Sequence, residues 1–225
     1  MHLFRVVVLL VVALMIQSCA VTGSKLPEQD SVKSNKAEVS ADVYLVPMAD
    51  FPESVSIIFA KLLSRELKVN VQSAPKLGKL NVSLFPGTNQ FVSDEILEKS
   101  QPILKSLRES PKAKYCLLLT KADIRSASGR DEFSFSWHNK NLNTSVASMA
   151  RMIEYIDGKP KVSKTTLTRL YKMSARAIGE LHLGWKRSTN PLDIMYSPIR
   201  SLSDIDMIGT THSGSVVERF EGPGK

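Results

Sequence analysis

Apolar and polar residues follow two spacings along this chain, and these spacings predict its strands and helices. Short apolar or alternating runs are typical of strands. The run Tyr115-Cys-Leu-Leu-Leu119 is flanked by charge and indicates the most deeply buried strand. Strands are predicted at residues 41–48, 69–71, 80–84, 114–120, 133–137 and 143–149.

Apolar residues that recur every three or four positions predict three amphipathic helices. They are expected at residues 55–67, 93–107 and 163–184. Asp50 and Ser93 are suited to cap the first two, Ser163 leads the third, and Gly184 ends it. Pro102 is expected to kink the second helix or to start its second half.

The order of these elements predicts an α/β fold, with a mixed sheet and packed helices. Residues 41–207 are long enough to form one domain with its own core. Asp157-Gly158 indicates a turn before the third helix. Residues 208–225 are rich in Gly and Ser and are predicted to form a loose tail.

The first residues indicate an exported protein. Met1 to Arg5 is a short basic start, and residues 6–16 form an apolar run that is too short for a membrane span but suits a signal peptide. Ile16-Gln-Ser-Cys19 resembles a bacterial lipobox. This resemblance implies a lipoprotein signal peptide at residues 1–18, diacylglycerol on the Cys19 thiol and an acyl chain on its amine. An ordinary signal peptide or an uncleaved anchor would also explain the run, and Gln17 is unusual in a lipobox.

Residues 19–40 have almost no apolar pattern and are predicted to be a lipidated flexible tether. Ala20, rather than aspartate, follows the cysteine, which in Gram-negative lipoproteins implies sorting to the outer membrane. The expected location is therefore the outer membrane, with the domain facing the periplasm and no nucleic acid as partner. Cys116 stands alone in an apolar strand, which is typical of core rather than of a nucleophile.

Positive charge gathers on the third predicted helix, in a chain whose formal net charge is +8. The residues are Lys161, Lys164, Arg169, Lys172 and Arg176. Their spacing favours a solvated helix face. The alternative is attraction to an anionic surface such as phospholipid headgroups, lipopolysaccharide or an acidic wall polymer.

The end of that helix carries the frame of a zinc-protease motif. The residues are Ala177-Ile-Gly-Glu-Leu-His-Leu-Gly-Trp-Lys-Arg187, followed by Asp193-Ile-Met-Tyr196. They resemble His-Glu-x-x-His-x-x-Gly-x-x-His with a methionine turn, the motif of the metzincins, and the spacing is most similar to that of archaemetzincins. The resemblance implies a metzincin-like fold, in which an active-site-type helix is followed by a methionine turn at Met195.

The resemblance also implies that the catalytic residues are missing. The first histidine, the general-base glutamate, the second histidine and the third histidine fall on Ala177, Ile178, Leu181 and Arg187. In the motif, imidazoles hold zinc, and the glutamate takes a proton from the zinc-bound water. A methyl, two branched alkyl groups and a guanidinium do neither, so no metal or other cofactor is expected.

Further segments resemble the family in the same order, from about residue 41 to residue 206. They are Val43-Tyr-Leu-Val-Pro-Met48, Asn89-Gln90-Phe91, Leu117 to Ile124, Phe133-Ser-Phe-Ser136, and Val146-Ala-Ser148 with Arg151. The family's second, cysteine-bound zinc site is absent, because its two cysteines fall on Ser188 and Asp193.

Three functions remain open. The first is a lipid-anchored pseudo-protease that binds or scaffolds an envelope protein or peptide, with Arg187 offering donors to a carboxylate. The second is an active zinc metallopeptidase with an atypical ligand set drawn from Glu180, His182, Asp193 or His212. Glu180 and His182 argue against it, since they project about 200° apart on a helix. The third is a generic outer-membrane lipoprotein that binds an envelope partner. The sequence favours the first.

Overall fold

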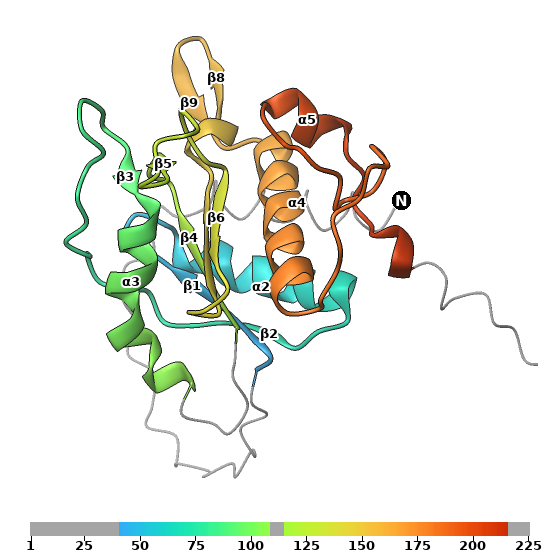
Figure 1. Cartoon of the computed structure of the whole chain (residues 1–225), viewed down its shortest axis with the longest axis horizontal. Coiled ribbons are helices and arrows are strands. Elements are labelled where there is room, and N and C mark those ends of the chain that lie inside the picture. The colour runs from blue at the N-terminus through green and yellow to red at the C-terminus, as the bar shows by residue number, and fades with distance from the viewer. Residues whose placement is uncertain (1–40, 109–114, 216–225) are drawn as a thin grey trace, which may run out of the picture. The chain divides into compact units, whose positions relative to one another are not determined.

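A five-stranded sheet organises the domain (Figure 1). The computed structural model describes residues 41–108 and 115–215, so the predicted signal peptide, Cys19 and the tether lie outside the described residues. The strand order is β2-β1-β4-β7-β6, and β6 is antiparallel to its neighbour while the other pairs are parallel. In that order the strands are Val71–Ser73, Val43–Pro47, Tyr115–Thr120, Thr144–Ser148 and Ser136–Asn139.

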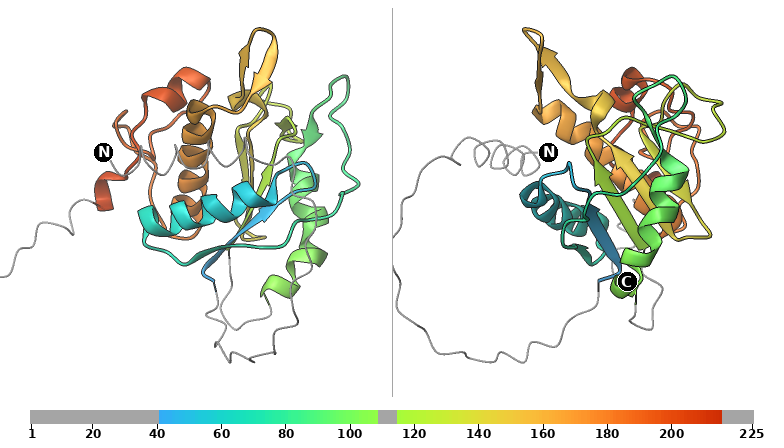
Figure 2. Two further views of the ribbon diagram at one scale, coloured as in Figure 1. Left: turned by 180° about the vertical axis from the view of Figure 1, so that it is seen from behind. Right: turned by 90° about the vertical axis from the view of Figure 1, so that its left-hand side faces the viewer.

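Helices cover both faces of the sheet (Figures 1 and 2). α3 (Ser93–Leu104) packs on one face, and α2 (Glu53–Leu67) and α4 (Lys164–Leu181) lie on the other. The whole of β4 is buried, because it has a strand on each side as well as helices above and below. The predicted α/β class, with a mixed sheet and packed helices, is confirmed.

The side chains of β4 alternate between two halves of the core. Cys116 and Leu118 pack with Ile96 and Leu97 of α3. The side chains of the opposite set are fully buried on the α2 and α4 side: Tyr115, Leu117 and Leu119. Cys116 is completely buried, in the core position that its apolar neighbours indicated.

Smaller elements connect these layers. β3 (Phe91–Val92) pairs with β5 (Ile124–Arg125), and β8 (Glu154–Ile156) forms a hairpin with β9 (Lys159–Lys161). The remaining elements are α5 (Leu202–Met207) and the short turns η1 (Ser106–Arg108), η2 (Ala150–Met152) and η3 (Ser213–Ser215).

Two strand predictions need correction. The strand expected at residues 133–137 begins only at Ser136, because Ser134 bridges to Ile124 instead of continuing along β7. Phe133 and Phe135 instead pack edge to face, with ring centroids 5.0 Å apart. Residues 80–84 form only an isolated bridge between Leu84 and Phe91. Alternation of side chains does not by itself supply a partner strand.

The predicted helix caps were right for α4 only. Ser163 accepts a hydrogen bond from the Thr166 amide and caps α4. Asp50 caps nothing, since its Oδ2 accepts from the Thr120 hydroxyl at 2.8 Å and ties the loop after β1 to the end of β4. Ser93 donates instead to the Arg125 carbonyl at 3.1 Å. Pro102 lies inside α3, two positions before its last residue, Leu104.

Buried cations on α4 hold α5 in place. Lys172 is only 6% exposed, and its Nζ donates to the carbonyls of Ile205 and Asp206 at 2.8 and 3.1 Å. Arg169 binds the Asp206 carboxylate through two nitrogens at 2.8 and 2.7 Å. Arg176, one turn further along the same side, is 3% exposed. The predicted solvated face is therefore wrong for this stripe, because the C-terminal segment covers it.

The segment after α5 is packed as far as Ser213, so the predicted loose tail is wrong for this stretch. Ile208 is 2% exposed, and His212 and Ser213 both bond to Asp193. Residues 216–225 lie outside the described residues. Within the described ranges, no helix has the length and apolar character needed to cross a bilayer.

Replacing Lys172 with methionine should destabilise the domain by about 1–3 kcal/mol. The methionine keeps the apolar stem but leaves two carbonyls of α5 without their buried donor. Urea unfolding of the purified chain measures the loss. Lys164→Met, at an exposed position of the same helix, is the control and should change stability by less than about 0.5 kcal/mol. Equal effects of the two substitutions would contradict this role of Lys172.

Candidate functional site

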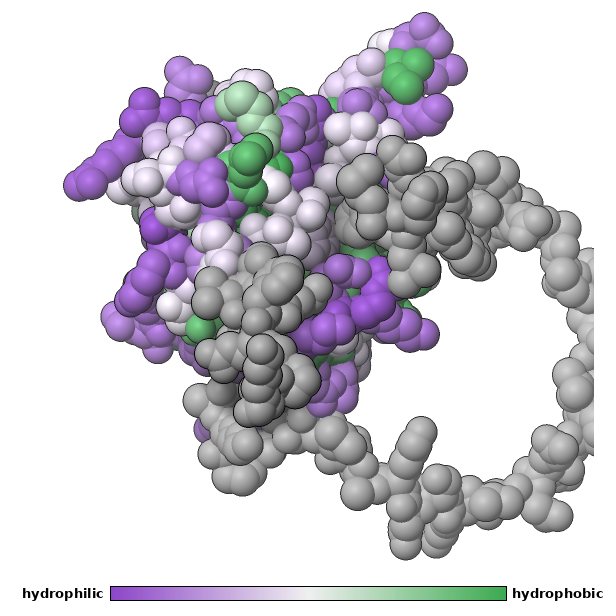
Figure 3. All heavy atoms as spheres, turned by 90° about the vertical axis from the view of Figure 1, so that its right-hand side faces the viewer, coloured by the Kyte–Doolittle hydropathy of each residue, from purple (hydrophilic) through white to green (hydrophobic). Residues whose placement is uncertain are grey.

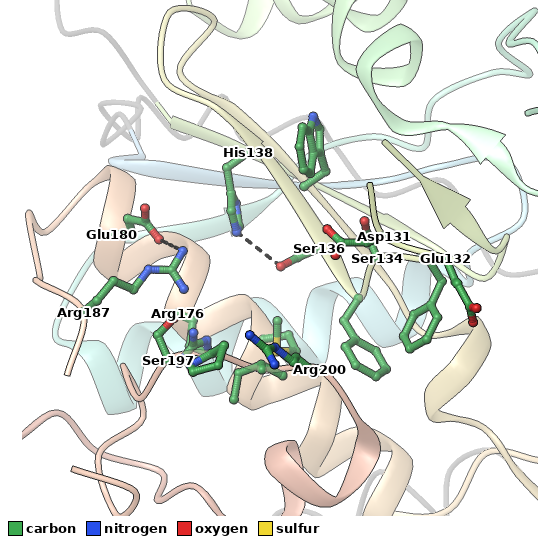
Figure 4. A pocket seen from close by; sticks show the side chains of 16 residues that line it. Asp131, Glu132, Ser134, Ser136, His138, Arg176, Glu180, Arg187, Ser197 and Arg200 are labelled. Carbon is green, nitrogen blue, oxygen red and sulfur yellow. Dashed lines mark hydrogen bonds and ion pairs between the residues drawn. The ribbon is translucent and has the colours of Figure 1, made fainter. Parts of the chain in front are cut away.

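A cleft of about 520 Å³ opens between β6, α4 and the segment that follows Met195 (Figure 4). β6 is the edge strand of the sheet, so it presents its outer edge beside this hollow. The cleft carries three arginines, three acids and one histidine. Its lining is residues 131–138, Met173, Arg176, Glu180, Arg187 and residues 197–200.

An ion pair occupies one end of the cleft. Arg187 Nη2 contacts Glu180 Oε2, and Figure 4 shows the two side chains meeting across the end of α4. The Arg187 side chain remains 45% exposed and that of Glu180 19% exposed. The predicted binding residue therefore does face the cleft, with an internal carboxylate already beside it.

Arg176 ties α4 to the methionine turn. Its Nη1 donates to the carbonyls of Ile194 and Tyr196 at 2.5 and 2.6 Å. Burial first, and then the charge of Arg187, lower the pKa of Arg176 to about 10, so it still carries its charge at neutral pH. The helix and the turn are thus joined by a guanidinium.

His138 lies on β6 between two serines. Its Nε2 is 3.2 Å from the Ser136 hydroxyl, and its Nδ1 is 2.7 Å from that of Ser145. Loss of solvent, and then the charges of Arg187 and Arg176, lower the pKa of His138 to about 3. The imidazole is therefore neutral.

A serine beside an imidazole can form a nucleophile and its base, but this pair is poorly suited to it. Moving the Ser136 proton to His138 would create an imidazolium beside two arginines. The ring nitrogen that a carboxylate orients in such sites is bonded here to the neutral hydroxyl of Ser145. The geometry does not support nucleophilic catalysis.

The residues of the cleft also do not fit a catalytic zinc ion. The side of α4 that lines it carries Met173, Arg176 and Glu180. Zinc needs three convergent imidazole, thiolate or carboxylate groups. Within residues 41–108 and 115–215, no three His, Cys, Asp or Glu side chains are close enough to hold a metal ion.

Of the four positions that the motif frame assigned to catalytic residues, only Arg187 lines the cleft. Ala177 and Ile178 are completely buried, and neither they nor Leu181 lines it. Of the atypical ligand set, Asp193 and His212 do meet, at 3.0 Å, while Glu180 pairs with Arg187.

Met195 sits in a tight turn against α4, as the motif frame indicated. Its side chain is fully buried, and the Tyr196 amide donates to the Asp193 carbonyl at 3.0 Å. The Asp193 carboxylate accepts from the Met195 amide at 2.7 Å and from the Ser213 hydroxyl at 2.5 Å. Asp193 therefore shapes the turn and attaches the C-terminal segment to it.

Trp185 closes the turn between α4 and this region. Its indole lies so close to Gly179 that any Cβ there would overlap the ring. The Trp185 ring system also contacts the His212 ring, with centroids 4.8 Å apart. Gly179 therefore permits a close approach, and Gly184, at φ +70°, supplies the left-handed turn that brings Trp185 back.

Three residues of the cleft were not predicted as site residues. Arg176 was assigned to a solvated face, although it directly precedes the motif frame. His138 follows Trp137 on the edge strand, but neither residue has a partner at a recognisable spacing. Arg200 lies in an irregular segment with no periodic signal.

The fold is archaemetzincin-like. A scan against protein-family models finds no match, and a search of curated proteins also finds none. Among solved structures, a zinc-dependent peptidase from Methanocorpusculum labreanum is similar, with a TM-score of 0.66 and 21% identity over 79% of this chain and 98% of that one. The predicted resemblance is confirmed at the level of the fold.

Two archaemetzincins show the same arrangement. That from Methanopyrus kandleri has a TM-score of 0.59 and 18% identity, covering 81% of this chain and 94% of its own. That from Archaeoglobus fulgidus, complexed with malonate, has a TM-score of 0.56 and 22% identity, covering 79% and 99%.

Asp193→Asn should cost roughly 2 kcal/mol of stability near neutral pH. Burial alone would raise the pKa of Asp193, but hydrogen bonds from Ser213, Met195 and His212 outweigh it and lower the pKa to about 2. The ionised carboxylate therefore stabilises the fold above the pKa of the unfolded chain, about 4, and this contribution is lost as pH falls towards 2.

Chemical unfolding at several pH values tests this dependence. The difference between wild type and Asp193→Asn should shrink as pH is lowered from about 6 towards 3. Asp131→Asn, at an exposed position, serves as the control and should show little difference at any pH. A cost for Asp193→Asn that stays constant over this range would rule out the charge of Asp193 as its cause.

Proposed function

We propose that this protein is a lipid-anchored, non-catalytic pseudo-protease whose cleft binds the carboxylate end of an extended peptide at the bacterial cell envelope. The observation that carries the proposal is the chemistry of the cleft. The cleft is open and has an edge strand along it. Three arginines line it, whereas a zinc peptidase needs metal-binding side chains in its cleft, and no such group of three is found among the described residues.

The edge strand supports the peptide part of the proposal. β6 bonds to β7 on one side, and no strand of the described residues pairs with its other side. An extended peptide can add to such an edge through main-chain hydrogen bonds, with its side chains alternating into and out of the hollow. Ser136 and Trp137 lie along this edge and line the cleft.

Arg187 supports the carboxylate part. Its half-exposed guanidinium can donate two parallel hydrogen bonds to a carboxylate, which a peptide terminus supplies. Glu180 occupies Arg187 in the empty cleft, so an incoming carboxylate competes with an internal one. The similar archaemetzincin from Archaeoglobus fulgidus is a complex with malonate, a small dicarboxylate.

The membrane anchor rests on the sequence. The apolar run at residues 6–16 and Cys19 after Ile16-Gln-Ser are the pattern of a lipoprotein signal peptide. Outer-membrane sorting follows from Ala20 in the position after the cysteine. The peptide that the cleft binds would then belong to an envelope protein facing the periplasm.

Arg187→Ala should weaken binding of a short peptide with a free carboxyl terminus by about tenfold or more, because it removes a charge-assisted pair. The probe is N-acetyl penta-alanine, and its C-terminal amide is the matched ligand. Binding to the full chain is measured by isothermal titration calorimetry. Glu180→Gln should strengthen binding, since it removes the internal competitor.

Lys61→Ala on α2 is the charge-matched control and should leave the affinity unchanged. Equal affinity for the acid and the amide would overturn the carboxylate role. Elemental mass spectrometry should be run on the same preparation, purified without chelator. About one zinc per chain, together with hydrolysis of a longer peptide, would replace the proposal with an active metallopeptidase of atypical ligand set.

The anchor has a separate test. In a Gram-negative host, the wild-type chain should incorporate labelled palmitate and fractionate with the outer membrane, whereas Cys19→Ser should carry no label. Cys116→Ser is the control and should be labelled like wild type, since that thiol lies in the core. Label retained in Cys19→Ser would contradict lipidation at this residue.

A further inference from the structure

The β8–β9 hairpin projects from the domain with apolar side chains that nothing covers. β8 and β9 pair only with each other among the described strands, and Figures 1 and 2 show the hairpin standing out beyond the start of α4. Tyr155 is 70% exposed and Ile156 46%. A two-stranded hairpin is only marginally stable alone, so large apolar groups at its tip indicate a surface that is buried on binding.

The register shows that the apolar groups surround the tip. Tyr155 faces Pro160 across the ladder, and Ile156 faces Lys159. Successive side chains of a strand point to opposite faces, so Tyr155 and Ile156 lie on opposite faces of the hairpin. A protein that docked on one face would leave the other apolar side chain in water, whereas a lipid interface surrounds both.

Basic residues follow the tip. Lys159, Lys161 and Lys164 are all exposed. Glu154 is paired across the ladder with Lys161, and Asp157 lies in the turn, so the hairpin and the start of α4 retain a net positive charge. Figure 3 shows the projection with apolar atoms among hydrophilic ones. Tyrosine at a bilayer interface, with lysines reaching the headgroups, is a favourable arrangement.

We propose that the tip of the β8–β9 hairpin enters the headgroup region of an anionic phospholipid bilayer. Tyr155 and Ile156 supply the apolar contact, and Lys159, Lys161 and Lys164 supply the attraction to lipid phosphate. The contact is independent of the predicted lipid on Cys19 and of carboxylate binding in the cleft.

The contact would also place the cleft relative to the bilayer. The hairpin is joined to η2, whose Arg151 binds the Asp123 carboxylate at 2.8 Å and stacks over the Phe133 ring at 4.2 Å. Phe133 lines the cleft. A hairpin held at the membrane therefore fixes the cleft mouth at a constant height above it.

A probe at the tip tests the proposal on the full chain. Tyr155→Cys in a Cys19→Ser background is labelled with an environment-sensitive fluorophore, since the remaining thiol, Cys116, is buried. The chain is mixed with vesicles of phosphatidylcholine alone or with added phosphatidylglycerol. The readout is local, so insertion of the apolar run at residues 6–16 does not confuse it. The emission should shift to the blue with the anionic vesicles.

Leu192→Cys, labelled in the same way, is the control. Leu192 is 73% exposed. It lies two residues before Ile194, whose carbonyl accepts a hydrogen bond from Arg176. Arg176 is about 18 Å along α4 from the end of that helix that carries the hairpin. Its probe should not shift. Lys159→Ala and Lys161→Ala should each weaken tip insertion roughly fivefold. Asp157→Asn should strengthen it, because asparagine tolerates the left-handed φ of +51° and removes a negative charge.

Three results would overturn the proposal. The first is a probe at position 155 that behaves like the one at position 192. The second is an equal shift with neutral and anionic vesicles, which would remove the role of the lysines. The third is a shift without vesicles that grows with protein concentration, which would assign the tip to contact with a second copy of the chain.

Discussion

Hydrogen bonds from buried cations to backbone carbonyls hold α4 and the C-terminal segment together beside the cleft. Lys172 and Arg176 project from one side of α4 and donate to carbonyls between Ile194 and Asp206, a stretch whose only regular element is α5. A buried cation is stable only when its donors are satisfied, and a charged donor contributes about 1.5–3 kcal/mol per hydrogen bond. The helix and the C-terminal segment therefore stabilise each other. In the zinc-protease motif that the chain resembles, a metal joins the active-site helix to the residues after its glycine. Here Arg176 joins α4 to the methionine turn, so the turn persists with a donor set that does not fit zinc.

The same cations determine the chemistry of the cleft. Burial, and then the charges of Arg187 and Arg176, lower the pKa of His138, so the imidazole stays neutral and is a weak proton acceptor, and the arginines leave an environment that favours anions. The Glu180 carboxylate neutralises part of that positive charge and holds the Arg187 side chain at one end of the cleft. A site with guanidinium donors beside a strand edge that no described strand pairs with can accommodate an extended, anionic peptide segment. Because Lys172 and Arg176 are buried, the basic surface near the start of α4 consists of the exposed lysines around the β8–β9 hairpin.

Predictions from local sequence were right where the conformation of a segment depends mainly on its own residues. The apolar run ending at Leu119 became the central strand, and Ser163 capped the helix that it precedes. Asp157-Gly158 formed the turn it indicated, with both residues at positive φ. Prediction failed where a partner distant in sequence decides the outcome. Asp50 is a residue type that often caps helices, yet its carboxylate accepts hydrogen bonds at the end of β4 and does not cap α2.

The spacing of apolar residues was enough to predict the succession of strands and helices, because the period of each element records which of its sides is apolar. It also indicated the zinc-protease frame and the absence of its ligands at the expected spacing, since spacing along one helix is a local property. Only the tertiary structure decided that Arg176 and Glu180, rather than Ala177 and Leu181, face the cleft. It alone decided that a basic stripe is buried. Burial of Lys172 and Arg176 depends on carbonyls of α5 and of the turn around Met195, more than fifteen residues away along the chain, and backbone groups leave no trace in a pattern of side chains.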